Sequence, residues 1–217
     1  MVMVGFALSK INLLIFVTAM FVIIVYFTFG FSNILLKQQT EQMINRYSGE
    51  ALSLIQSKSL CVQNKLVLPP SISYIGSQRI FYQLKIEKID STNPDKPNSL
   101  IFSIFARKDL QHPLASRRID VKGNIFLFNQ DDADRTLNAQ VREVVVDPQA
   151  VGQFDSLFIA KQTQAVTVNG TVQSADNIYI ANCSSATVAS CQSAIQTVGA
   201  SISAAHNGNS ECVKATA

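Results

Sequence analysis

The sequence predicts an α+β protein, in which a long N-terminal hydrophobic helix of the transmembrane type precedes an antiparallel β-sheet or sandwich domain. Three observations predict this class. An uncharged apolar run covers residues 11–36, a helical period continues beyond it, and a period of two begins at Arg79 and recurs with no helices between the segments. We therefore divide the chain into a membrane-spanning or filament-core helix (1–36), an amphipathic extension of that helix (37–60) and an extracytoplasmic β-rich domain (61–217).

The apolar run, Ile11 to Leu36, lies between Lys10 and Lys37 and contains no charged side chain. As a helix it would be about 39 Å long, and a bilayer core needs about 20 apolar residues. A surface helix of a soluble domain is not apolar on every face over such a length. We therefore expect the run to lie in lipid or to pack among copies of itself. The residues that represent this assembly helix are Ile11, Phe16, Ile23, Phe27 and Leu36.

The run also carries a few uncharged polar side chains. Each of them either hydrogen-bonds to a neighbouring helix or bonds to the backbone of its own helix. The sequence leaves both roles open for Asn12, Thr18, Thr28, Ser32 and Asn33.

The helical period does not stop where the apolar run ends. Apolar residues recur at spacings of three and four, at Met43, Tyr47, Ala51, Leu54 and Ile55, with polar residues between them. The pattern predicts one nearly continuous helix, from about residue 8 to about residue 58, with an apolar stripe on one face. We expect this stripe to pack on the domain that follows. The alternative is a juxtamembrane stalk that contacts nothing.

Beyond the helix, turn signals separate short alternating segments. Pro69-Pro70 forces extended backbone, and Asn169-Gly170 is a favoured type I′ pair that predicts a hairpin between 154–168 and 171–182. The other predicted strands cover 79–89, 100–106, about 119–128 and 137–147, with loops at 107–118 and 129–136 and a short helix at 190–205.

Composition and motifs argue against catalysis and against nucleic acid. The net charge is +3, and no Lys/Arg run indicates a nucleic-acid surface. No motif places a nucleophile, a phosphate-binding loop or a set of metal ligands, so we expect no enzyme, no cofactor and no metal. The segment 129–134 clusters three carboxylates but lacks the glycine and glutamate of a calcium loop. We interpret His112 and His206 as surface residues.

Four cysteines, all beyond the apolar run, indicate an oxidising compartment and two disulfides. From locality alone we expect the pairs Cys183–Cys191 and Cys61–Cys212; buried free thiols are the alternative. The cysteines also place the N-terminus in the cytoplasm and the C-terminal domain outside the cell. Two sequons make Asn169 and Asn182 possible glycosylation sites.

A helix that is hydrophobic first and amphipathic second, leading into a β-rich domain with cysteines, resembles the type IV pilin superfamily, which includes archaeal pilins and related surface filaments. Gly5-Phe6 resembles the processing junction of that family. The resemblance covers residues 5–60 and implies that the apolar helices bundle in a filament core, with the domains outside. Lys10 stands where bacterial members carry a glutamate, and the leader MVMV lacks basic residues. The chain is therefore either cleaved after Gly5 or left unprocessed.

Two functions fit these observations. The first is a structural one, a pilin-like subunit whose helix anchors in the membrane and packs against other copies in an extracellular filament. The second is a monomeric, single-pass membrane-anchored ectodomain that binds a ligand or a cell-surface partner through 107–118 or 129–136. We expect the chain at the cell membrane in both cases, or in an extracellular filament in the first.

Overall fold

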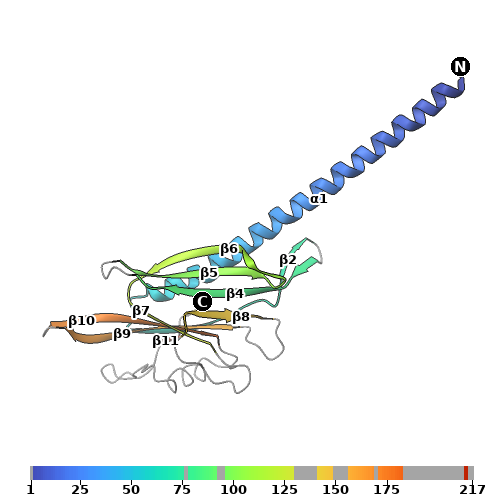
Figure 1. The fold of residues 1–217 in the computed structure, drawn as a ribbon. Helices are drawn as coiled ribbons and strands as arrows, with labels where there is room; N and C mark the ends of the chain where they lie inside the picture. The colour runs from blue at the N-terminus through green and yellow to red at the C-terminus, as the bar shows by residue number, and fades with distance from the viewer. Residues whose placement is uncertain are drawn as a thin grey trace.

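A computed structural model of the chain describes residues 2–75, 78–91, 96–129, 141–148, 156–168, 171–182 and 213–214. One helix, α1 (Val2–Ile55), projects from a layered β domain at the other end of the molecule (Figure 1). Its N-terminal part extends away from the domain, and its C-terminal part lies against the domain. The predicted α+β class is confirmed, and α1 ends within a few residues of the predicted position.

The described strands form two larger sheets and a small one. The five-stranded sheet has the order β11-β1-β9-β10-β7, with β1 (Cys61–Val67), β7 (Asn124–Phe128), β9 (Ser156–Val168), β10 (Thr171–Asn182) and β11 (Val213–Lys214). The four-stranded sheet has the order β6-β5-β4-β8, with β4 (Tyr82–Ile89), β5 (Asn98–Ala106), β6 (Asp109–Val121) and β8 (Glu143–Val146). The small sheet pairs β2 (Ile72–Ile75) with β3 (Gln78–Ile80). The described pairings are antiparallel except β1 with β11 and β7 with β10.

The two larger sheets lie over one another as layers (Figure 1), and their inner faces form the core. Ile86 on β4 is opposite Phe102 on β5, and Ile159 on β9 is opposite Ile180 on β10. All four side chains are fully buried. The predicted strand 79–89 is divided between β3 and β4, and because successive side chains point to opposite faces, its alternation places Tyr82, Leu84 and Ile86 in this core.

The C-terminal part of α1 completes the core from one side. Its apolar stripe is buried: Tyr47, Ala51, Leu54 and Ile55 are at most 6% exposed, and Met43 is partly buried against the core. The predicted packing of the stripe on the domain is therefore confirmed. The structure does not support the alternative of a stalk that contacts nothing.

The other side of the sandwich is joined by side-chain amides that cap β8. Asn129 Nδ2 donates to the Glu143 carbonyl at 2.9 Å, and Asn129 Oδ1 accepts from Val145 N–H at 3.2 Å. Asn182 Nδ2, at the end of β10, donates to the Val145 carbonyl at 2.9 Å. β8 is an edge strand, so some of its backbone N–H and C=O groups have no partner on β4. The amides of Asn129 and Asn182 bond to these groups and thereby link the two sheets along this edge.

The predicted loop at 107–118 is wrong, because most of it is strand β6. β6 pairs with β5, and the register shifts twice, between the pairs Ile104–Ala115 and Phe105–Pro113 and again between Phe105–Pro113 and Ala106–Asp109. Proline is tolerated in an edge strand at a bulge, because the sheet needs no hydrogen bond from a backbone N–H at that position. One of the two segments predicted to bind a ligand as a loop is therefore part of a sheet.

The predicted single strand at about 119–128 is also wrong. The chain turns at Gly123 and passes from β6 in one sheet to β7 in the other. Gly123 has φ +126°, and a Cβ there would overlap the backbone carbonyl of Asp176. Only glycine accepts this backbone and this approach without strain.

The hairpin of β9 and β10 confirms the predicted pairing of these segments. The Asn169-Gly170 turn itself, the predicted helix at 190–205, His206 and residues 130–140 lie outside the described residues.

Candidate functional site

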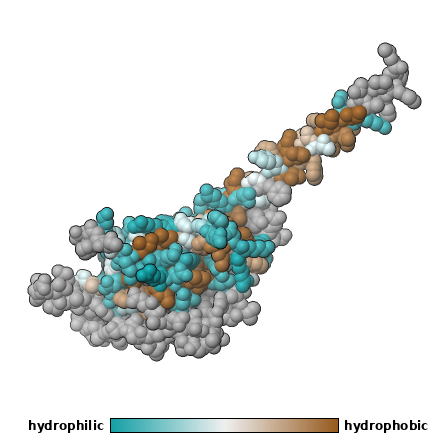
Figure 2. Space-filling model, in the orientation of Figure 1, coloured by the Kyte–Doolittle hydropathy of each residue, from teal (hydrophilic) through white to brown (hydrophobic). Residues whose placement is uncertain are grey.

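The bare half of α1 is the principal candidate site. From Lys10 to Ile34 the described side chains are exposed or half-buried, and none of the described strands covers them. Figure 2 shows this segment as an apolar rod that leaves a largely hydrophilic domain. Among the described residues, α1 is the one helix long and apolar enough to cross a membrane.

Four of the five predicted assembly residues lie on this bare segment. Ile11 is 53% exposed, Phe16 62%, Ile23 49% and Phe27 69%. Such continuous apolar exposure is unfavourable in water and marks a surface that lipid or protein covers. Leu36 is different, because it is partly buried against the core of the domain. It therefore lies where the bare segment meets the docked part of the helix.

Hydroxyl side chains of the bare segment bond to their own helix. Thr18 Oγ1 donates to the Leu14 carbonyl at 2.9 Å, Thr28 Oγ1 to the Ile24 carbonyl at 2.7 Å, and Ser32 Oγ to the Thr28 carbonyl at 2.8 Å. Of the two roles that the sequence leaves open, the structure shows the bonds to the helix's own backbone. These hydroxyls therefore enter an apolar environment already hydrogen-bonded.

The structure places the remaining predicted residues as follows. Gly5 and Phe6 lie within α1. Cys61 opens β1 and is disulfide-bonded, whereas Cys183, Cys191, Cys212 and Asn169 lie outside the described residues. Asn182 is 5% exposed, and its Nδ2 is the donor to Val145. A glycan on this nitrogen would displace that bond and expose the end of β10, which argues against the predicted modification at Asn182.

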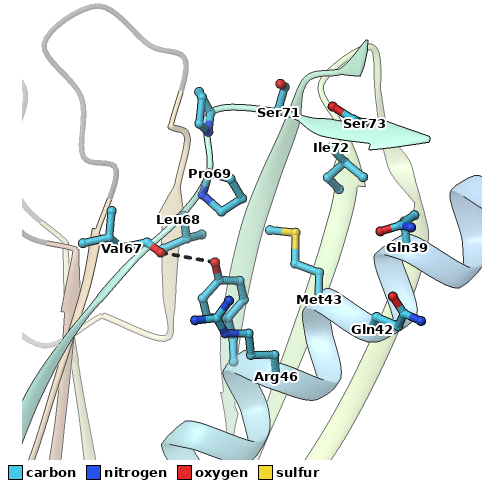
Figure 3. A pocket seen from close by; sticks show the side chains of 12 residues that line it. Gln39, Gln42, Met43, Arg46, Val67, Leu68, Pro69, Ser71, Ile72 and Ser73 are labelled. Carbon is cyan, nitrogen blue, oxygen red and sulfur yellow. Dashed lines mark hydrogen bonds between the residues drawn. The ribbon is translucent and has the colours of Figure 1, made fainter. Parts of the chain in front are cut away.

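A groove beside the docked part of α1 is a second candidate, which the sequence did not predict. It has a volume of about 770 Å³ and lies between α1 and the connection from β1 to β2. Met43, Leu68 and Ile72 give it an apolar floor, while Gln39 and Arg46 stand at its helical rim (Figure 3). Residues distant in sequence form it, so no local motif could indicate it.

Two tyrosine hydroxyls fix the wall of this groove. Tyr47 Oη donates to the Val67 carbonyl at 3.2 Å (Figure 3), and Tyr82 Oη donates to the Pro69 carbonyl at 2.7 Å. Burial raises the pKa of both phenols, so both stay neutral and remain donors. The extended segment that Pro69-Pro70 begins is thereby held against α1 and β4.

Within the described ranges no set of side chains is arranged for metal binding or for catalysis. No three His, Cys, Asp or Glu residues there could hold one metal ion. His112 is exposed on β6, and its Nδ1 is 3.1 Å from Asp109 Oδ2. The carboxylate cluster at 129–134 lies, apart from Asn129, outside the described residues.

The fold and the bare helix define a β-sandwich protein with one candidate membrane-spanning helix at its N-terminus. No protein-family model, curated protein or solved structure matches the chain.

Proposed function

We propose that this protein is a pilin-like structural subunit of the cell surface. In this proposal α1 anchors the chain in the membrane and, in the assembled state, packs against the same helix of other copies in the core of an extracellular filament. The β domain lies outside the cell and forms the outer layer of the filament. The protein needs no cofactor for this role and binds no nucleic acid.

One observation carries the proposal: α1 is a single unbroken helix with two differently used halves. The half after Leu36 buries one face against the domain, whereas the described side chains between Lys10 and Ile34 are exposed or half-buried. A membrane anchor alone needs only about 20 residues and no rigid connection to its domain. A continuous helix fixes the distance and direction between the apolar rod and the domain, which a regular assembly requires.

The chemistry of the rod also suits a bundle of identical helices. Between Lys10 and Lys37 it carries no charge, so close packing buries no unpaired ion. Gly30 has open space where a Cβ would lie, so nothing within the chain requires a glycine there. Glycine in a membrane helix allows the backbone of a second helix to approach closely.

The alternative function is a monomeric, membrane-anchored ectodomain that binds a ligand or a cell-surface partner. The observation that favours it is the groove between α1 and the Pro69-Pro70 segment, with an apolar floor and a polar rim. Such a mixture of linings is typical of small-ligand sites. The groove is open on one side, and it replaces the segment 107–118 as the surface that this alternative would use.

Assembly can be tested by a charge in the middle of the rod. An unpaired charge at the centre of a membrane helix costs about 2.5–3.5 kcal/mol on insertion scales, and every subunit would carry it. We expect the full-length protein to form filaments visible by electron microscopy when detergent is removed, and the Ile23→Asp variant to form none.

Two controls accompany this test. Ile23→Val keeps an apolar side chain and should assemble as the parent does, and Leu60→Asp places a charge on an exposed residue outside the rod. If Ile23→Asp assembles as well as the parent, or the parent never forms filaments, the helix is an anchor only and the ectodomain alternative takes its place.

A further inference from the structure

We propose that the end of the β domain nearest the bare half of α1 docks on the headgroups of an anionic lipid surface, through Phe81, Leu110 and the cations beside them. This inference rests on the anchoring role proposed above for α1, and it adds a second, peripheral membrane contact made by the domain itself. We call this surface, formed by Arg79, Phe81, Arg107, Lys108 and Leu110, the proximal patch.

The sheet register brings the proximal patch together. Arg107 N–H donates to the Phe81 carbonyl at 2.9 Å, at the point where β4 begins and β5 ends. Lys108 and Leu110 follow directly, around the turn into β6. Phe81 is 46% exposed and Leu110 54%, among the few large apolar side chains outside α1 that the described chain exposes to this extent.

The patch lies at the end of the sandwich from which the bare helix departs. Arg117 Nη1 of β6 donates to Asn45 Oδ1 of α1 at 2.7 Å. Arg117 and Asn45 therefore lie at the same level along β6 and α1. The β5 residues paired with Arg117 and Asp109 are Phe102 and Ala106, which lie four residues apart, or about 13 Å along the sheet. The same distance covers about nine residues of helix, which leads from Asn45 to the neighbourhood of Leu36. In Figure 1 the end of the domain that carries β2 accordingly faces the side toward which α1 leaves.

This level is also where a bilayer would end. The apolar run stops at Lys37, and the preceding apolar residues are enough to fill a hydrocarbon core. Because α1 continues from the run into the domain without a break, no flexible linker lets the domain stand off from the surface. Anchoring the rod therefore brings Phe81 and Leu110 to the height of the headgroups.

The charges of the patch select the kind of lipid. Arg79 and Lys108 are exposed cations, and Lys37 is exposed on the helix at the same end. Of the acidic groups here, Asp147 lies 3.3 Å from Arg107 and Glu41 lies 3.9 Å from Lys37, so each is offset by one cation. Asp109 lies 3.1 Å from His112 Nδ1 and is offset when that imidazole is protonated, which leaves Arg79 and Lys108 as the cations of this surface beyond these pairs. Exposed cations beside apolar side chains are the combination that binds anionic headgroups and places apolar groups at the acyl boundary.

The absence of tryptophan from the sequence allows a direct test with single-tryptophan reporters. Full-length Phe81→Trp and Leu110→Trp proteins are reconstituted into vesicles of phosphatidylcholine with phosphatidylglycerol and into vesicles of phosphatidylcholine alone. The matched control is Ile89→Trp, since Ile89 is 44% exposed at the opposite end of β4. Quenching by lipids labelled close to the headgroup reports contact with the surface.

We expect blue-shifted, strongly quenched emission from both patch reporters in the anionic vesicles, weaker quenching in the neutral vesicles, and none from Ile89→Trp. Patch reporters that behave like Ile89→Trp would overturn the docking. Quenching of equal strength in both vesicles would overturn anionic lipid as the partner.

A fourth reporter, Ile23→Trp, tests the anchor itself with lipids labelled at the bilayer centre. If Ile23→Trp is quenched while the patch reporters are not, the anchoring proposal stands and the docking is wrong. If Ile23→Trp is not quenched, the anchoring proposal fails first.

Discussion

At the scale of single residues, Lys161 joins the end of α1 to the five-stranded sheet. Its side chain is 7% exposed, its Nζ donates to the Ser57 carbonyl at 2.7 Å, and it lies 3.3 Å from Asp176 Oδ2. Asp176 also accepts from Thr163 Oγ1 at 2.6 Å. A cation is favourable where a helix ends, because the last carbonyls carry partial negative charge and lack intrahelical partners.

We predict that Lys161→Met lowers the free energy of unfolding of the domain by about 1.5–3 kcal/mol, the range for a hydrogen bond to a charged group. The control is Lys85→Met. The ammonium group of Lys85 bridges Glu87 and Glu143 at the surface of the four-stranded sheet. Exposed pairs of this kind contribute about 0–1 kcal/mol. Urea unfolding in detergent, followed by circular dichroism, measures both. Equal losses for the two variants would contradict a special role of Lys161.

At the scale of elements, the two halves of α1 have the same secondary structure and opposite environments. The described side chains from Lys10 to Ile34 are exposed or half-buried, while the later half presents Leu54 and Ile55 to the core. An apolar residue in the first half therefore contributes to contacts outside the chain. An apolar residue in the second half contributes to the stability of the domain.

This division predicts different outcomes for the same substitution. Leu54→Ala should destabilise the domain by about 2–5 kcal/mol, because it removes buried methyl groups and leaves a cavity. Leu13→Ala should leave the unfolding midpoint in detergent unchanged, since Leu13 is 65% exposed. Thermal unfolding of both variants measures the difference. A loss at Leu13 of the same size would mean that the bare half also packs on the domain.

The sequence predicts the elements better than their connections. Periodicity reveals α1, its buried stripe and the β9–β10 hairpin, because each is a local pattern. The sequence does not predict β1 and β2 within 61–75, and its errors at 107–118 and around Gly123 concern pairing across the fold. A bulge lets Pro113 join an edge strand, and one glycine carries the chain between sheets. The groove and the proximal patch share that cause, since strand register assembles them from distant segments.

At the scale of the whole molecule, the strand order brings the two ends of the β domain together. β11, near the C-terminus, lies parallel to β1, the first strand after α1, with Val62 opposite Val213. The C-terminal strand is thus placed beside the strand that directly follows the helix. A covalent bond at this point would fasten the domain where any force transmitted along α1 enters it.

The last prediction concerns that bond. Cys61, which opens β1, is disulfide-bonded, and in the sequence Cys212 directly precedes β11, so each cysteine comes one residue before the Val62–Val213 pair. Neighbouring strands are about 4.8 Å apart, within the span of about 4.4–6.8 Å between the Cα atoms of a disulfide. We therefore predict the pair Cys61–Cys212, which leaves Cys183 and Cys191 to form the second bond.

Non-reducing peptide mapping should recover these two linked pairs from the full-length protein. The bond to Cys61 closes a loop long enough to contribute about 4–5 kcal/mol in the chain-entropy model. Cys61→Ser with Cys212→Ser should therefore lower the unfolding midpoint clearly and speed amide exchange at Val213 and Lys214, which β1 holds. A peptide that joins Cys61 to Cys183 or Cys191 would show that the strand register does not select the pair.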